Sequence, residues 1–156
     1  MGDSHCRLLY HLVFGTRDRI QLIAPEMAER LYAYMAGVVK GIGGTPIAIG
    51  GTTDHVHLLV ELDKNKTVPD AIRDIKTNSS RWVHQTYPQL TGFSWQDGYG
   101  AFTVSVRGVE QVKTYIRSQE ERHRRVSFRD EYVRFLRDNG IAPEAGVQDE
   151  VTPAGR

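Results

Sequence analysis

The chain has 156 residues and a net charge of +1, with 40% hydrophobic and 25% charged residues, values typical of one folded globular domain rather than a disordered or fibrous chain. No apolar run approaches the roughly 18 residues that span a bilayer, and the N-terminus lacks the apolar core of a signal peptide, so we expect a cytoplasmic protein with no membrane partner. Cys6 is the only cysteine, which excludes an internal disulfide and a zinc site made of cysteines.

The first part of the chain predicts a strand followed by a helix. Residues 7–14 are rich in β-formers and contain no glycine or proline, which indicates a strand buried on both faces. Residues 16–19, with Arg17 and Arg19, are expected to form an exposed basic loop. Pro25 suits the first turn of a helix, and apolar residues then recur at helical spacing until a cluster of glycines ends the pattern.

A hairpin and a second helix follow. Residues 45–49 predict a short strand, the Gly-Gly pair at 50–51 a tight turn, and residues 55–62 a third strand antiparallel to the second. Residues 67–70 resemble the capping box at the start of a helix. Apolar residues then recur at helical spacing up to Pro88, so the second helix has one face directed to the core.

The remaining segments complete an α+β pattern. Residues 98–106 predict a fourth strand, residues 108–124 a helix and residues 128–138 a last helix. We expect residues 1–140 to form a single domain and residues 141–156 a disordered tail. The order strand, helix, strand, strand, helix, strand is that of a ferredoxin-like or RRM-like sandwich, here extended by a C-terminal helix that carries a tyrosine. In such a fold the helices cover one face of an antiparallel sheet and leave the other free for a ligand.

Two histidines share one face of the third predicted strand. Successive side chains of a strand point to opposite faces, so Val56 and Leu58 point one way while His55 and His57 point the other. We expect the apolar set to face the helices and the two imidazoles to converge on one ion at the open face. A His-x-His pair is a weak signal by itself, because most such pairs are surface or hydrogen-bonded histidines.

The helix predicted over residues 108–124 carries a second pair of polar side chains. A rotation of 100° per residue places Ile116 on the packing stripe and Tyr115 and Gln119 on its flank. Being four residues apart, Tyr115 and Gln119 lie on one face, and a metal bound by the Gln119 carbonyl would sit beside the Tyr115 hydroxyl. Taken alone, the pair is more simply explained by a tyrosine at the core edge and a solvated glutamine.

The two motifs together resemble a known family. The sequence Thr53-Asp-His-Val-His-Leu-Leu-Val60, followed further along the chain by Tyr115-Ile-Arg-Ser-Gln119, is similar to the single-tyrosine HUH transposases of the insertion-sequence 200/605 family, the IS200-like transposases. Tyr10-His-Leu-Val-Phe14 also looks like their first strand. The resemblance covers roughly residues 8–139, and both motifs in this order are far more specific than either alone.

The resemblance implies a site and a reaction. It assigns His55, His57 and Gln119 as metal ligands and Tyr115 as the nucleophile. Two imidazoles and an amide oxygen leave coordination positions open, which suits Mg²⁺ or Mn²⁺ better than a closed structural Zn²⁺. Attack of the tyrosine on single-stranded DNA would leave a 5′-phosphotyrosine and a free 3′-hydroxyl, and another 3′-hydroxyl could reverse the step and join new ends without ATP.

The resemblance also implies partners. Members of the family act on single-stranded element ends that contain hairpins, and they work as homodimers in which the tyrosine helix of one subunit completes the histidine pair of the other. We therefore expect single-stranded DNA and a second copy of this chain as partners.

Basic residues supply the expected DNA contacts. Residues 107–137 contain nine Lys or Arg against five Asp or Glu, whereas the segments before and after them have no positive excess. The candidates for phosphate binding lie in the first loop, on the second helix and around the tyrosine helix: Arg17, Arg19, Arg73, Lys76, Arg81, Arg117, Arg122 and Arg124. Each of them could instead be a solvated surface charge.

Three other functions fit parts of the sequence. A ferredoxin-like module could bind single-stranded DNA or RNA without cutting it, although this chain lacks the aromatic pairs that such modules carry on central strands. A small metallohydrolase could use His55 and His57 with Glu61, but this leaves Tyr115 and Gln119 without a purpose. A domesticated transposase that processes host repeats would have the same catalytic residues as the family.

Overall fold

A four-stranded antiparallel sheet forms the centre of the computed structural model, which describes residues 2–123 and 125–143. Its strands are β1 (Leu9–Gly15), β2 (Thr45–Gly51), β3 (His55–Glu61) and β4 (Gly100–Thr103). Their order in the sheet is β2-β3-β1-β4, so that β1 and β3 are central. These two strands pair along their whole length, from Leu9 opposite Glu61 to Gly15 opposite His55.

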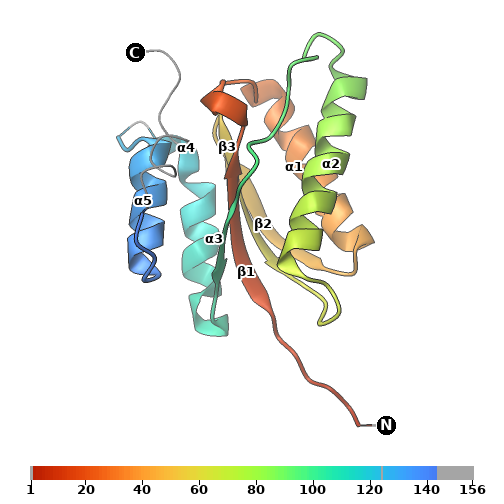
Figure 1. The fold of residues 1–156 in the computed structure, drawn as a ribbon, viewed down its shortest axis with the longest axis vertical. Coiled ribbons are helices and arrows are strands. Elements are labelled where there is room, and N and C mark those ends of the chain that lie inside the picture. The colour runs from red at the N-terminus through yellow and green to blue at the C-terminus, as the bar shows by residue number, and fades with distance from the viewer. Residues whose placement is uncertain (1, 124, 144–156) are drawn as a thin grey trace.

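One face of the sheet packs against two long helices, α1 (Pro25–Gly41) and α2 (Val68–Thr86) (Figure 1). Thr67 caps α2, because its hydroxyl accepts a hydrogen bond from the backbone N–H of Asp70 at 3.3 Å. Alternate residues of the central strands and one side of each helix form the main core, which includes Leu12, Phe14, Leu31, Met35, Val56, Leu58, Ile72 and Ile75. The predicted α+β class and the predicted order of strands and helices along the chain are confirmed.

The opposite face of the sheet is also covered, so the expectation of a free face is wrong. Three shorter helices lie there: α3 (Val109–Arg117), α4 (Gln119–Arg122) and α5 (Phe128–Asp138) (Figure 1). A second, smaller apolar cluster joins the sheet to α5 through Val13, Phe102, Phe128, Tyr132 and Leu136. The described chain therefore has three layers, with the sheet in the middle.

Gly50 and Gly51 lie within β2, whereas two consecutive glycines had predicted a tight turn at this point. A Cβ atom on Gly50 would lie 2.8 Å from the backbone oxygen of Ile116, and one on Gly51 would lie 2.1 Å from the backbone oxygen of His55. The turn itself is made by residues 52–54. The two glycines are therefore needed for close packing, since they let α3 and the neighbouring strand approach the backbone of β2.

Two predicted elements differ in extent. β4 ends at Thr103 instead of reaching residue 106, and a short 3-10 helix, Val106–Gly108, leads into α3. The single helix predicted over residues 108–124 is divided at Ser118, whose backbone angles (φ −96°, ψ 14°) end α3 and precede α4. After the division Gln119 is buried, whereas Glu120 and Glu121 are exposed.

The segment expected as an exposed basic loop forms one 3-10 turn, Arg17–Arg19. Arg17 is exposed as expected, but Arg19 is only 6% exposed and its guanidinium lies 3.9 Å from the centre of the Phe128 ring. The expectation of an exposed loop is therefore wrong for Arg19. The predicted tail lies for the most part outside the described residues, which end at residue 143.

No helix in the described ranges is long and apolar enough to cross a membrane.

Candidate active site

The two motif histidines lie on the side of β3 that faces α3 and α5. Val56 on the same strand belongs to the main core, whereas His55 and His57 are fully buried on the opposite side, with ring centres 5.1 Å apart. The predicted alternation along β3 is confirmed. Glu61, the additional residue of the hydrolase alternative, forms an ion pair with Arg7 at 3.6 Å at the far end of the strand.

Tyr115 and Gln119 reach the same place from α3 and from the start of α4. Gln119 is 1% exposed, and its side-chain oxygen Oε1 lies 3.0 Å from Nε2 of His55. The ring centre of Tyr115 lies 5.6 Å from that of His57. One chain thus brings the residues of both motifs together, and the simpler explanation of Gln119 as a solvated side chain is wrong.

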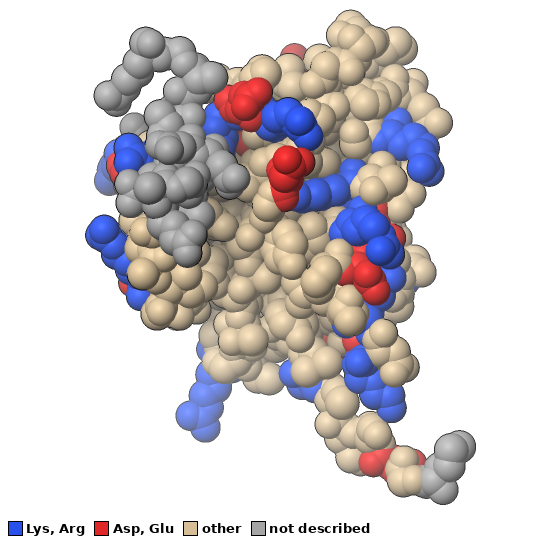
Figure 2. Space-filling view, in the orientation of Figure 1, with Lys and Arg blue, Asp and Glu red and all other residues tan. Residues whose placement is uncertain are grey.

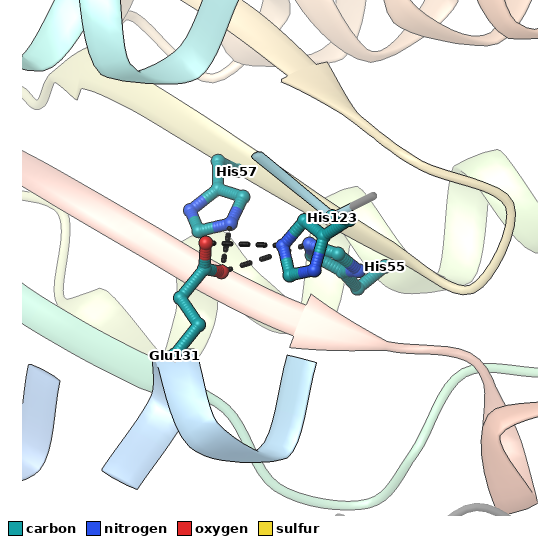
Figure 3. A group of neighbouring side chains, drawn as sticks. All are labelled: His55, His57, His123 and Glu131. Atoms are coloured by element: carbon teal, nitrogen blue, oxygen red, sulfur yellow. Dashed lines mark hydrogen bonds and ion pairs between the residues drawn. The ribbon is translucent and has the colours of Figure 1, made fainter. Parts of the chain in front are cut away.

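Two further residues complete the cluster, and the sequence motifs do not include them. Glu131 extends from α5 and is 3% exposed, and His123 directly follows α4. Figure 3 shows the Glu131 carboxylate between His57 and His123, with Oε1 2.9 Å from Nε2 of His57 and Oε2 3.0 Å from Nε2 of His123. The Tyr115 hydroxyl donates a hydrogen bond to the same Oε2.

The surroundings of His55 test whether the cluster fits a metal ion. Nδ1 of His55 lies 2.7 Å from a carboxylate oxygen of Asp54, and burial lowers the pKa of His55 to about 4, so near neutral pH the ring is neutral with a single N–H. With that proton on Nδ1, toward the carboxylate, the lone pair of Nε2 faces the lone pairs of Gln119 Oε1. Two acceptors in contact repel each other unless a cation binds both, so the donor set fits a cation.

The ligand types are those of a divalent cation site. One donor atom from each of His55, His57, His123 and Glu131 lies within 4.8 Å of the other three. The amide oxygen of Gln119 adds a further neutral oxygen ligand at the side of His55. A mixture of imidazole nitrogen with carboxylate and amide oxygen suits Mn²⁺ and Mg²⁺, the ions expected from the sequence.

His11 lies behind His57 and was not recognised as a functional residue in the sequence. It projects from β1, is 3% exposed, and its Nε2 lies 2.8 Å from Nδ1 of His57. Burial lowers the pKa of His11 to about 3, so this ring is also neutral at physiological pH. His11 thus orients His57 as Asp54 orients His55, a type of support that metal-binding histidines commonly have.

The environment of Tyr115 favours its neutral form. Burial raises the pKa of Tyr115, and the negative charge of Glu131 raises it further. Arg122 acts in the opposite direction, with its guanidinium 4.4 Å from the centre of the Tyr115 ring. For Glu131, burial alone would raise the pKa, but hydrogen bonds with His123 and His57 outweigh it and hold the pKa well below its usual range.

Several of the predicted DNA-binding residues have partners within the protein. Arg73 pairs with Asp70 at 3.2 Å, and the ammonium of Lys76 donates to the backbone oxygens of Gln96 and Gly98 at 2.7 Å each. Lys76 therefore holds the loop before β4 against α2. Arg122, as described above, lies against the nucleophile candidate instead of projecting into solvent.

Four predicted DNA-binding residues are exposed: Arg17, Arg73, Arg81 and Arg117. Arg17 lies 3.2 Å from the carboxylate of Asp97, and both side chains are in solvent. Figure 2 shows Lys and Arg side chains interleaved with Asp and Glu on the α2 side of the molecule, so this view has no unbroken positive surface. Arg124 lies outside the described residues.

Comparisons with known proteins identify the family of the chain. Residues 4–119 match the family described as "Transposase IS200 like". The ISDra2 transposase TnpA of Deinococcus radiodurans is 31% identical over 121 residues, which cover 74% of this chain and 86% of that protein.

Solved structures give the same result. A crystal structure of a candidate transposase from Deinococcus radiodurans R1 matches with a TM-score of 0.62 and 28% identity, over 76% of this chain and 98% of that chain. A REP-associated tyrosine transposase bound to a REP hairpin matches with a TM-score of 0.57 over 100% of this chain and 98% of that chain. At 17% identity, this second match shows the fold alone.

The matched stretch contains the whole sheet, the histidine pair and the helix that carries Tyr115, and the match shows that the chain is a transposase. The chain belongs to the IS200-like transposase family. The resemblance found in the two sequence motifs is therefore confirmed.

Proposed function

We propose that this transposase cleaves and rejoins single-stranded DNA, with Tyr115 as the nucleophile and a divalent cation at His55, His57 and Gln119. The observation that carries the proposal is the position of the Tyr115 hydroxyl at the edge of the buried histidine cluster. A nucleophile and the group that orients its target have to be held a few ångströms apart for efficient attack. A Mg²⁺ or Mn²⁺ ion bound there would act as a Lewis acid on the scissile phosphate.

The reaction exchanges one phosphoester for another. Tyr115 gives up its phenolic proton, its oxygen forms a bond to phosphorus, and the bond between phosphorus and the 3′ oxygen breaks. The 3′ oxygen takes up a proton and leaves as a free hydroxyl, while the 5′ phosphate stays on the tyrosine. Attack by another 3′-hydroxyl reverses these steps and joins new ends, so the energy of the phosphodiester is conserved and no nucleotide cofactor is needed.

The residues around Tyr115 contribute to this step in different ways. Burial and the charge of Glu131 raise the pKa of the phenol, and the positive charge of Arg122 offsets part of that rise because it favours the phenolate. His11 and Asp54 fix the rings of His57 and His55, so that Nε2 of each ring points into the cluster.

Single-stranded DNA with hairpins is the proposed substrate, and a neighbour of the same fold is bound to a REP hairpin. A cavity of about 510 Å³ lies next to the cluster and is lined by His123, Phe128 and Arg19 among others, which gives an unstacked base room beside the cation site. The exposed residues Arg17, Arg73, Arg81 and Arg117 remain the candidates for phosphate contacts. A homodimer with shared sites is a further proposal from the family, although Tyr115 here lies beside the histidines of its own chain.

The decisive experiment compares Tyr115→Phe with Tyr99→Phe on a labelled single-stranded oligonucleotide in Mn²⁺. Tyr115→Phe removes one oxygen and keeps the ring, so Mn²⁺ binding should survive while cleavage and the covalent adduct fall by about 10³-fold or more. Tyr99 is partly exposed and lies outside the cluster, so its variant should still form the adduct. Cleavage by Tyr115→Phe at the wild-type rate, or a nucleotide mapped to another side chain, would overturn the proposal.

A further inference from the structure

Glu131 occupies a position that the proposed function does not use. It belongs to α5, which lies beyond the stretch of residues 4–119 that matches the family. On α5 it shares the buried side of the helix with Phe128, Tyr132 and Leu136. An acidic side chain in such an apolar row is costly unless its charge is compensated.

The contacts of the carboxylate divide between its two oxygens. Oε1 faces the motif histidines, at 2.9 Å from Nε2 of His57 and 3.7 Å from Nε2 of His55. Oε2 accepts the hydrogen bond from Tyr115 and lies 3.0 Å from Nε2 of His123. One oxygen is thus directed to His57 and His55, and the other to His123, as Figure 3 shows. This second oxygen also accepts hydrogen bonds from the Tyr115 hydroxyl and from Nε2 of Gln119.

The separations on the Oε1 side are close to those of ligands that share an ion. Two atoms that each bind one ion at about 2.1 Å lie about 3.0 to 3.5 Å apart for octahedral to tetrahedral angles. The distance from Oε1 to His57 lies just below this range, and the distance to His55 lies slightly above it. A divalent cation there would also compensate the buried charge.

We infer that Glu131 is a further ligand of the divalent cation through Oε1 and holds the Tyr115 hydroxyl next to that cation through Oε2. The inference rests on the proposed function, because it places the same cation at His55 and His57. It makes α5 part of the active site, and it gives the nucleophile and the cation a common support. Contacts that bind the carboxylate on both sides explain why a glutamate is buried in the apolar side of α5.

The test measures Mn²⁺ affinity by calorimetry on the full chain, which separates ligation from catalysis. Glu131→Gln keeps the size of the side chain and removes the charge, so it should weaken Mn²⁺ binding by at least about 10-fold. Asp130→Asn makes the same charge change one residue away at an exposed position, and it should stay within about twofold of the wild type. A His55→Ala, His57→Ala double variant should lose measurable binding.

The outcomes separate the two proposals. If Glu131→Gln binds Mn²⁺ as tightly as the wild type or more tightly while the double histidine variant loses binding, Glu131 is no ligand and the proposed function stands. If the wild type itself fails to bind Mn²⁺, both fall. Should Glu131→Gln not fold, Glu131→Asp with Co²⁺ provides the readout: the shorter carboxylate should change the visible spectrum of the bound ion, and a spectrum identical to that of the wild type would overturn the inference.

Discussion

Each face of the sheet is covered by one layer of helices, but the two faces bury very different side chains. Toward α1 and α2, β1 and β3 present Leu12, Phe14, Val56 and Leu58, all fully buried in an apolar core. Toward α3 and α5, the same strands present His11, His55 and His57, which are equally buried but are surrounded by a carboxylate, an amide and a phenol. Neighbouring positions on one strand thus have opposite chemistry.

The difference indicates that one face mainly stabilises the fold and the other mainly holds the proposed site. Burial of a Leu or Phe side chain stabilises a fold by about 1.5–3 kcal/mol, whereas a buried polar group adds little even when it is paired and is costly when it is not. The α1–α2 face therefore supplies most of the stability. The α3–α5 face holds polar groups whose burial costs free energy, and the proposed cation would compensate that cost.

Substitutions at the adjacent residues His57 and Leu58 of β3 should separate cation binding by one face from stabilisation by the other. Leu58→Ala leaves a cavity in the main core and should lower the free energy of unfolding by about 2–5 kcal/mol, while Mn²⁺ still stabilises the folded protein. His57→Ala should abolish the stabilisation by Mn²⁺, which for the wild type amounts to about 2.7 kcal/mol at a hundredfold excess of ion over Kd. Urea unfolding with and without Mn²⁺ measures both quantities.

The matched control is Val60→Ala, another core position of β3 at 0% exposure, which should resemble Leu58→Ala with a smaller loss. If Mn²⁺ stabilised His57→Ala as much as the wild type, the separation of stability and cation binding between the two faces would be contradicted. A Leu58→Ala variant that no longer responds to Mn²⁺ would contradict it as well.

The sequence revealed the part of the site that follows local rules. The alternation along β3 separates His55 and His57 from the core residues, and the helical spacing of four brings Tyr115 and Gln119 to one side. The interruption at Ser118 does not disturb this, because Gln119 begins the next helix and still turns toward the sheet. Short-range periodicity therefore placed these four residues on the correct faces, whereas their proposed roles as ligands and nucleophile came from the family resemblance.

The residues that were missed depend on packing between distant segments. His11 pairs with His57 across two strands, and Glu131 approaches from a helix whose docking position has no signature in local spacing. One signal was present: Phe128, Glu131, Tyr132 and Phe135 follow the i, i+3, i+4, i+7 pattern, so Glu131 interrupts an apolar stripe. The covered face of the sheet follows from the same docking of α5 and was missed for the same reason.

The pH dependence of stability should also distinguish the two faces. His55 and His11 have pKa values lowered to about 4 and about 3 by burial, so below about pH 6.5 the unfolded chain takes up protons that the folded chain does not. The free energy of unfolding without metal should therefore fall as the pH is lowered from about 6.5 to about 4, by up to about 1.4 kcal/mol per pH unit for each histidine. Glu131, whose pKa is lowered, adds to the loss below its unfolded pKa.

Urea unfolding in EDTA at several pH values between about 4.5 and 7.5 measures this slope. His11→Gln removes one of the two titrating rings and should make the profile less steep. A wild-type profile that is flat over this interval would contradict the account of a neutral, buried histidine cluster.

The smallest effect concerns the basic residues on the α1–α2 side, where Lys76 and Arg81 both come from α2. Lys76 donates two hydrogen bonds of 2.7 Å to the backbone of the loop before β4, so Lys76→Met should lower the free energy of unfolding by about 1–3 kcal/mol.

Arg81 is exposed, so Arg81→Ala should leave stability within about 0.5 kcal/mol. If Arg81 binds a phosphate, its loss should weaken single-stranded DNA binding and reduce the slope of log affinity against log salt by about 0.7. Urea unfolding and DNA titrations at several salt concentrations give the two readouts on the same variants. A stable Lys76→Met variant with a reduced salt slope would instead identify Lys76 as a DNA contact and remove its structural role.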